Sequence, residues 1–344
     1  MHAKHSDLSR EEEREGFLAP LALAIKSLGL RGKRVLVGVS GGADSVGLMR
    51  GLRALAEAGE LELVAAHLDH GIRRRAGPRD AAWTAALCRH FDIPIVVEKA
   101  DVPAYASEHR MNIEEAARTV RYEFFERAAR VERCSHVAVA HTADDQVETV
   151  LHHLFRGTGL AGLRGMQAVR PLAEGLTLVR PLLRIRRGQI VEWLREVGQR
   201  FCTDATNLDE SRTRNRIRHS VLPTLERELG PPVRDAILRV AEQAGELQSA
   251  IEELAAGLLT QCIQDETTDV VRLNAEALSR QPRHLVREVF VELWKRKNWP
   301  RQAIGFDDWD KLWRLVKQGG SATLPGAIKV TRRGTLIVIR GPAS

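Results

Sequence analysis

The residue types that could do chemistry first gather at residues 40–45, where a branched apolar run ends and a helical pattern begins. Two glycines let the backbone turn sharply and approach an anion, while serine hydroxyls, backbone N–H groups and the helix start favour phosphate. Asp44 would repel phosphate unless a cation lay between them, and Mg²⁺ binds a few carboxylates together with phosphate oxygens. The stretch predicts a phosphate-binding loop with a magnesium ligand. Its members are Ser40, Gly41, Gly42, Ala43, Asp44 and Ser45.

Other interpretations of this loop are weaker. Its purely structural explanation is a Gly-Gly turn capped by Ser and Asp. No Walker A sequence occurs, and a G-x-G-x-x-G match at residues 157–162 follows a helical stretch instead of a strand, so it does not predict a dinucleotide site. Ser-Gly-Gly-x-Asp-Ser after a strand resembles the loop of the PP-loop ATP pyrophosphatases. The resemblance implies that ATP adenylates a carbonyl-like carbon and that pyrophosphate is released.

Two carboxylates follow a predicted strand further along the chain. Asp145 and Glu148 stand three residues apart at the start of a predicted helix, residues 144–155, and therefore share one helix face. They could hold Mg²⁺ together with Asp44, or receive an incoming ammonium group. The alternative is that Asp144 caps the helix while Asp145 and Glu148 only interact with its N-terminal dipole.

His141 and Arg121 are candidates for contacts with a nucleotide. His141 comes directly after the predicted strand 136–140, where it could bind a phosphate oxygen, carry a proton, or be a hydrogen-bonded structural residue. Arg121 lies in the predicted helix 113–130. It belongs either to a salt-bridged solvated face or to the site, where it would neutralise charge on a transferring phosphoryl or adenylyl group.

The sequence argues against a zinc ribbon, an iron–sulfur centre and a dithiol site. Its four cysteines lie far apart without a C-x-x-C pair, which favours free thiols in a reducing compartment. His67 and His70 flank Asp69. Without a third ligand at suitable spacing, they are weak evidence for zinc.

Basic and amide side chains cluster in residues 212–219. Such a cluster predicts contacts with the phosphate backbone of a nucleic acid, and its alternative is a solvated surface loop. We favour the first interpretation because a nucleotide-activating domain precedes the cluster. The candidate residues are Arg212, Arg214, Asn215, Arg216 and Arg218.

The elements that must position these residues form an α/β pattern. Short apolar runs alternate with longer helical stretches, which is typical of βαβ units in a parallel sheet covered on both faces. Ligands of such sheets bind beyond the carboxyl ends of the strands, where the polar loops fall. We expect a doubly wound, Rossmann-like PP-loop fold. Its strands are predicted near residues 35–39, 61–67, 93–97, 136–140 and 176–179.

A Gly-Pro-Pro sequence at residues 230–232 marks a predicted domain boundary. We expect residues 1–230 to form the catalytic domain. Residues 231–344 should form a helical connector and a smaller α+β domain that binds substrate, with a strand near 269–273 and a hairpin-like end. The tryptophans of this part are expected in a core, and no catalytic constellation is evident there.

The composition is that of an ordinary globular protein with a basic excess. The 344 residues carry a net charge of +7, which is compatible with a polyanionic partner. No run of about 18 apolar residues occurs. The N-terminal stretch is highly charged, so we expect neither a membrane span nor a signal peptide, and we expect a cytoplasmic protein.

Five sequence blocks narrow the resemblance within the PP-loop class. In order and spacing they resemble the motifs of tRNA(Ile)-lysidine synthases over roughly residues 33–225, and the C-terminal part resembles that family's substrate-binding region more loosely. The blocks are Leu68–Arg73, Asn112–Tyr122, Ala140–Thr149, Phe155–Leu160 and Arg214–Arg218.

The resemblance implies a two-step reaction on a tRNA anticodon, with ATP and Mg²⁺ as cofactors. ATP adenylates the C2 oxygen of the cytidine at the first anticodon position (34) of the isoleucine tRNA with a CAU anticodon, and pyrophosphate leaves. The ε-amine of free L-lysine then attacks C2 and displaces AMP. The product, lysidine, pairs with A instead of G and changes the tRNA from methionine to isoleucine identity.

The resemblance also suggests residue roles. Asp145 and Glu148 are implied as partners of lysine, His141 as a phosphate contact and Arg121 as a charge-stabilising group. Asp44 and Asp145 are the candidate Mg²⁺ ligands, but the division of Mg²⁺ and lysine among the three carboxylates stays open.

Three rival functions fit the sequence less well. A tRNA thiolase of the same superfamily generally needs a cysteine pair or an Fe–S cluster, and a small-molecule amidotransferase needs an ammonia-source domain. A non-catalytic RNA-binding protein would not need the intact loop at residues 40–45. The chain is short for the resembled family, so we expect it to lack the module with which longer members hold the acceptor end. A homodimer is an open expectation.

Overall fold

The computed structural model describes residues 16–56, 61–72, 76–202, 213–301 and 303–342. The chain divides into two compact units between Ala241 and Glu242, and each is described by itself. The division falls within the long helix α12 (Val233–Cys262), which begins just after the Gly-Pro-Pro sequence at residues 230–232.

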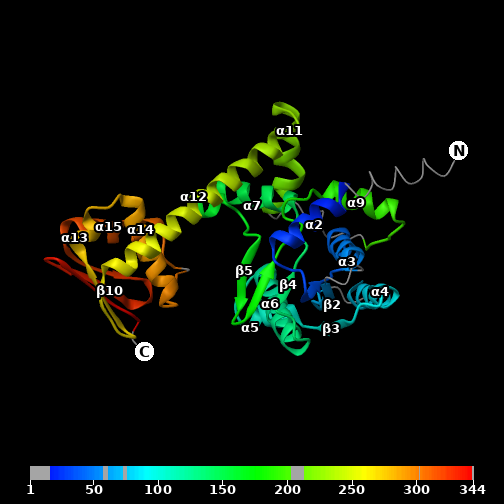
Figure 1. The fold of residues 1–344 in the computed structure, drawn as a ribbon, viewed down its shortest axis with the longest axis horizontal. Helices are drawn as coiled ribbons and strands as arrows, with labels where there is room; N and C mark the ends of the chain where they lie inside the picture. The colour runs from blue at the N-terminus through cyan, green and yellow to red at the C-terminus, as the bar shows by residue number, and fades with distance from the viewer. Residues whose placement is uncertain (1–15, 57–60, 73–75, 203–212, 302, 343–344) are drawn as a thin grey trace. The chain divides into compact units, whose positions relative to one another are not determined.

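The first unit is built on a six-stranded sheet with the order β3-β2-β1-β4-β6-β5 (Figure 1). Every neighbouring pair is parallel except β5 with β6, which is antiparallel. The strands are β1 (Lys33–Gly38), β2 (Leu61–Asp69), β3 (Ile95–Lys99), β4 (His136–Ala138), β5 (Val169–Ala173) and β6 (Leu176–Val179). The predicted doubly wound α/β fold is confirmed.

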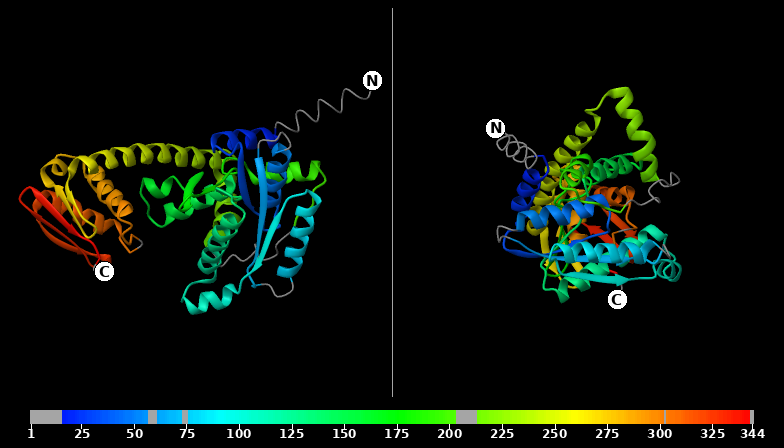
Figure 2. Two further views of the ribbon diagram at one scale, coloured as in Figure 1. Left: turned by 60° about the horizontal axis from the view of Figure 1, so that its bottom comes forward. Right: turned by 90° about the vertical axis from the view of Figure 1, so that its right-hand side faces the viewer.

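Helices cover both faces of this sheet because its central strands are apolar on both sides (Figures 1 and 2). In β1, Val35 and Val37 belong to one buried cluster and Leu36 to the other. The first cluster packs on α2 (Leu18–Ser27), α3 (Ala43–Ala56), α4 (Ala76–His90) and α9 (Arg187–Glu196). The second packs on α5 (Val102–Glu108) and α6 (Ile113–Val131).

A smaller helical group completes the first unit. It comprises α7 (Ala143–Phe155), α8 (Leu160–Leu163), α10 (Thr213–Arg216), the π-helical segment η2 (Ile217–Val221) and α11 (Leu222–Leu229). Val147 and Leu151 of α7 form a separate buried cluster with Ile217 and Leu222. This cluster attaches the predicted basic region to the helix that carries the predicted carboxylates.

The second unit pairs an antiparallel sheet, in the order β7-β8-β11-β10-β9, with helices on one side. Its strands are β7 (Ile263–Glu266), β8 (Val270–Asn274), β9 (Gly320–Leu324), β10 (Ile328–Arg333) and β11 (Leu336–Arg340). Its shorter helices are α13 (Ala275–Ser279), α14 (Arg283–Arg296), η3 (Pro325–Ala327) and α15 (Phe306–Gln318). Trp294 is fully buried, with its ring centroid 5.5 Å from that of Trp309, as expected for core tryptophans.

Several elements differ from the sequence prediction. Helix α9 was not predicted, because its buried Ile190, Trp193 and Leu194 lie in a sequence region dominated by arginines. Strand β2 extends two residues beyond the predicted end at residue 67, so His67 and Asp69 are buried strand residues. None of the described helices combines the length and apolar character needed to cross a bilayer.

Close packing of α3 against α9 generates a stability prediction. A Cβ added at Gly47 of α3 would lie 2.3 Å from Cγ2 of the buried Ile190 of α9. We expect Gly47→Ala to lower the free energy of unfolding by about 1–3 kcal/mol through overpacking. Gly188→Ala, a helical position with nothing within 4 Å of its Cβ, should instead raise it by about 0.4–1 kcal/mol. Urea unfolding of both variants checks the pair; equal effects would refute the packing argument.

Candidate functional site

Strands β1 and β4 are adjacent in the sheet although β2 and β3 come between them in the chain. The connection from β1 therefore leads to one side of the sheet and β4 starts the other side, which creates a crevice beyond their carboxyl ends. The loop at residues 40–45 follows β1, and His141 and the start of α7 follow β4. The topology thus brings the predicted phosphate loop and the predicted carboxylates to the same crevice.

The loop after β1 is held in shape by its own serines. Ser45 Oγ accepts a hydrogen bond from the Ser40 N–H (3.0 Å) and donates one to the Gly42 carbonyl (3.0 Å). Gly41 has φ +91°, a conformation that strongly favours glycine, and its carbonyl accepts from the Cys202 N–H (2.9 Å). The predicted strand, turn and helix are all present, so the N-terminus of α3 opens into the crevice.

Asp44 is the carboxylate of this loop, and one of its oxygens lacks a partner. Its Oδ2 accepts from Arg187 Nη1 (3.2 Å), whereas Oδ1 is buried without a hydrogen bond from any described residue. Burial raises the pKa of Asp44 to about 6; Arg187 opposes the rise, and the nearby Asp145 adds to it. A buried orphan carboxylate oxygen beside a phosphate loop fits a divalent cation.

Asp145 and Glu148 share one guanidinium group. Arg218 of η2 donates through Nε to Glu148 Oε1 (2.5 Å), and through Nη2 to Glu148 Oε2 (3.1 Å) and Asp145 Oδ1 (3.1 Å). The second oxygen of Asp145 accepts from the N–H and Oγ1 of Thr142, which caps α7. Burial raises the pKa of Glu148, which is 5% exposed, although Arg218 opposes the rise. The two carboxylates, Glu148 buried and Asp145 half-buried, therefore form a cation-binding pair.

Asp144 connects the crevice to two further arginines. Its Oδ2 accepts from the Arg187 N–H (2.8 Å) and its Oδ1 from Arg234 Nη1 (2.9 Å). Arg234 also pairs with Glu226 (2.5 Å). Thr142, rather than Asp144, makes the side-chain cap of α7, so Asp144 is free to join α9 and α12 to the crevice.

His141 is neutral in this setting. Burial, and next the charge of Arg180, lower its pKa to about 4. Its Nδ1 is buried and has no hydrogen-bond partner in the described parts of the chain. A neutral imidazole with a vacant nitrogen can contact a phosphate oxygen, but it is a poor base in the absence of a bound anion.

Arg121 lies on the exposed side of α6, where its Nη2 is 3.4 Å from Nε2 of His70 after β2. This contact places Arg121 near the carboxyl edge of the sheet, and its role in the site stays a prediction.

The predicted RNA-binding cluster is divided between the surface and the crevice. Arg214 and Arg216 are exposed and Asn215 is half-buried, whereas Arg218 points to the carboxylates. Arg212 lies outside the described residues. The π-helical turn that carries Arg218 is an uncommon conformation that is frequent at functional sites.

Sequence reasoning missed three participants in the site: Arg187, Arg234 and Thr142. The two arginines meet their carboxylates across 143 and 90 residues of chain, and no sequence spacing signals such a pairing. Thr142 was detectable, because Thr three residues before Asp is the pattern of a capping box.

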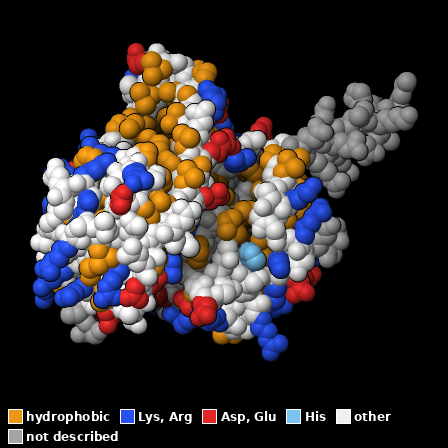
Figure 3. All heavy atoms as spheres, turned by 60° about the vertical axis from the view of Figure 1, so that its left-hand side comes forward, with side chains coloured by type: hydrophobic (Ala, Val, Ile, Leu, Met, Phe, Trp, Pro, Cys, Tyr) orange, Lys and Arg blue, Asp and Glu red, His pale blue; other side chains and the backbone are white. Residues whose placement is uncertain are grey.

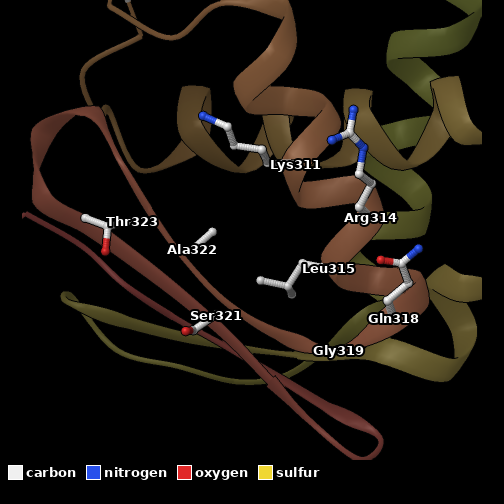
Figure 4. Close-up of a pocket in the computed structure, with 8 residues that line it drawn as sticks. All are labelled: Lys311, Arg314, Leu315, Gln318, Gly319, Ser321, Ala322 and Thr323. Atoms are coloured by element: carbon white, nitrogen blue, oxygen red, sulfur yellow. The ribbon is translucent and has the colours of Figure 1, made fainter.

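A shallow pocket in the second unit offers no comparable chemistry. Its polar lining residues are Lys311, Arg314, Gln318, Ser321 and Thr323 (Figure 4). Both cations have carboxylate partners, Lys311 with Asp308 (2.8 Å) and Arg314 with Asp310 (2.8 Å). Across the described ranges, no three side chains of metal-binding type gather as a cluster in either unit. The crevice of the first unit is therefore the candidate active site.

Comparisons with known proteins show the family of the chain. The family model described as a PP-loop domain matches residues 17–225. A tRNA(Ile)-lysidine synthase from Rhodopirellula baltica is 34% identical over 82% of this chain and 79% of its own length. Those from Dehalococcoides mccartyi and Bacillus subtilis are 37% and 35% identical, over 78% and 76% of this chain. The chain spans 59% and 55% of these two proteins.

A solved structure shares the fold. The U34-tRNA thiolase NcsA from Methanococcus maripaludis, with its 4Fe-4S cluster, superposes with a TM-score of 0.53 at 20% sequence identity, over 67% of this chain and 79% of that one. The family model and the relatives together show that the chain belongs to the PP-loop family and, within it, to the tRNA(Ile)-lysidine synthases.

Proposed function

We propose that this chain joins free L-lysine to C2 of the cytidine at the first anticodon position of the isoleucine tRNA with a CAU anticodon. ATP adenylates the C2 oxygen and pyrophosphate leaves. The lysine ε-amine then forms the C–N bond as the C–O bond to AMP breaks. The names of the curated relatives support the substrate, and the crevice supports the chemistry.

One observation carries this proposal: the carboxylate pair beside the phosphate loop, with Glu148 buried and Asp145 half-buried, already holds a cationic side chain. Arg218 contacts both Asp145 and Glu148 at hydrogen-bond distances. A site that binds a guanidinium at this depth suits the ammonium of lysine, which needs anionic partners when it leaves water. We propose that lysine takes a position at this pair, and that a carboxylate receives the proton that the amine must lose.

The orphan oxygen of Asp44 supports a role in holding Mg²⁺. Asp145 is the weaker candidate ligand, because Thr142 and Arg218 already occupy its two oxygens. Bound there, the ion would neutralise negative charge on the triphosphate. The loop N–H groups and the start of α3 bind phosphate directly, and His141 and Arg121 add contacts at the same edge.

A thiolase function is less well supported. The likeness to NcsA shows the shared fold, at an identity too low to indicate its activity. Three of the four cysteines, at positions 88, 134 and 262, are buried, and burial raises the pKa of each thiol. Such thiols are poor nucleophiles and metal ligands.

The role of the second unit and the oligomeric state of the chain are further parts of the proposal. We propose that residues 242–344 contribute to tRNA binding, in keeping with the family resemblance. Homodimer formation stays a prediction. Within the second unit, helix α12 exposes Leu247 and Leu254, seven residues apart. Figure 3 shows hydrophobic side chains on one face of the molecule. Heptad-spaced apolar residues are typical of helices that pair, so this is where we would look for a second copy.

Incorporation of labelled lysine tests the proposed function. The chain is incubated with an isoleucine tRNA transcript carrying a CAU anticodon, with and without ATP, and the nucleosides are analysed. We expect ATP-dependent label at the first anticodon position and none on a transcript with a GAU anticodon. Pyrophosphate release that depends on tRNA but yields no lysine label would reject lysine as the nucleophile.

Replacing Asp44 by asparagine should lower activity but raise stability. Its ordinary pKa is 3.8 and its folded pKa about 6, so the cost of ionisation to folding builds up as pH rises from 3.8 to about 6, is complete above that range, and is absent when both states are protonated. We expect Asp44→Asn to stabilise the fold by on the order of 1–3 kcal/mol at about pH 8, with almost no gain at about pH 3, where both states are protonated. Turnover should fall about 100-fold or more while tRNA binding persists. Unchanged turnover would refute the assignment.

Replacing Glu148 should weaken the use of lysine more than the reaction with ATP. We expect Glu148→Gln to raise the KM for lysine by about 10- to 100-fold, because the variant no longer offers a charged partner to the ammonium group. Pyrophosphate release from ATP and tRNA should persist.

The matched control is Glu126→Gln, which removes only the exposed partner of Arg130 (2.9 Å). Because Glu148→Gln also weakens the hold on Arg218, thermal unfolding is recorded alongside. A loss of stability with an unchanged KM for lysine would show that Glu148 is structural.

A further inference from the structure

A second group of cations surrounds Tyr122 of α6. The guanidinium carbon of Arg118 lies 5.1 Å from the Tyr122 ring centroid, and that of Arg170 on β5 lies 4.8 Å from it. Arg180, directly after β6, acts electrostatically on the same tyrosine. Burial raises the pKa of Tyr122, but Arg118, Arg170 and Arg180 outweigh burial and lower it.

These arginines have no acidic counterpart. Arg118, Arg170 and Arg180 form no ion pair with a carboxylate in the part of the chain that the structure describes. Elsewhere in the first unit, Arg187, Arg218 and Arg234 each pair with at least one carboxylate. The group around Tyr122 is therefore a local excess of positive charge.

Burial of Arg180 makes this excess of positive charge unfavourable for folding. Its side chain is 4% exposed, Nη1 donates to the Gln167 carbonyl (2.5 Å), and Nε is buried without a hydrogen-bond partner among the described residues. A buried guanidinium without an anion is unfavourable, because hydration is removed and no charge replaces it. His141 Nδ1, also buried and vacant, belongs to a ring whose pKa Arg180 lowers. Among the described residues, Arg180 therefore lacks a counter-charge.

We infer that Arg118, Arg170 and Arg180 around Tyr122 form a second anion site, which binds a phosphodiester of the RNA substrate next to the reactive nucleotide. The inference rests on the proposed function in taking RNA as the substrate. A phosphodiester is favoured over the ATP triphosphate because the loop after β1 already supplies a triphosphate cradle. Arginine is also the residue best suited to bind phosphate with two donors at once.

Filter binding of the CAU-anticodon transcript, without ATP or lysine and over a series of salt concentrations, tests the inference. Arg118 is exposed and Arg170 half-buried, so alanine at either position should fold, whereas the buried Arg180 is left unchanged. We expect Arg118→Ala and Arg170→Ala each to weaken tRNA binding about tenfold. The salt slope should fall by about 0.7 for each phosphate of single-stranded RNA that the variant no longer neutralises. The KM for ATP should not change.

Arg130→Ala is the matched control, since Arg130 lies on the same helix and pairs only with the exposed Glu126. Equal tRNA affinity and salt slope in all variants would overturn the inference, and so would a raised KM for ATP with unchanged tRNA affinity. A wild-type chain that binds the transcript without forming lysidine would refute the proposed function alone. One that forms lysidine while both variants bind normally would refute only the anion site.

Discussion

The structure depends on balancing several carboxylates that the sheet topology forces into one crevice. Asp44, Asp144, Asp145 and Glu148 line the region beyond the ends of β1 and β4, and burial raises the pKa of Asp44 and Glu148. Arginines from α9, η2 and α12 supply the counter-charge. These ion pairs join segments far apart in the chain, so the same contacts that neutralise the site also hold its walls together.

The charges in the crevice are not fully paired. The unpaired groups are those to which we assign the proposed ligands. Within the part of the chain that the structure describes, one Asp44 oxygen lacks a positive partner, whereas Arg180 lacks a negative one. The first suits a metal ion with the triphosphate, and the second suits a phosphate of RNA. Arg218 occupies the carboxylate pair where we propose that lysine binds. Uncompensated charge lowers the stability of the free protein and raises its affinity for ligands of opposite charge.

Local sequence signals predicted the parts of the site that lie within single segments. The Ser-Gly-Gly turn, the paired acids of α7 and the alternation of strands and helices were enough for the fold and for both sides of the crevice. They could not predict which arginine meets which acid, because Arg187 is 143 residues from Asp44. The same limit applies to Arg218, whose sequence context suggested a surface contact with RNA while its side chain points inward.

The central claim is that this crevice activates the tRNA with ATP before lysine reacts. It is tested most directly by a single-turnover measurement with tRNA and labelled ATP in the absence of lysine. The account predicts that the molar amount of pyrophosphate released equals the amount of bound tRNA. AMP should stay attached to the tRNA until lysine is added. Pyrophosphate and AMP that appear together, and only when lysine is present, would contradict it.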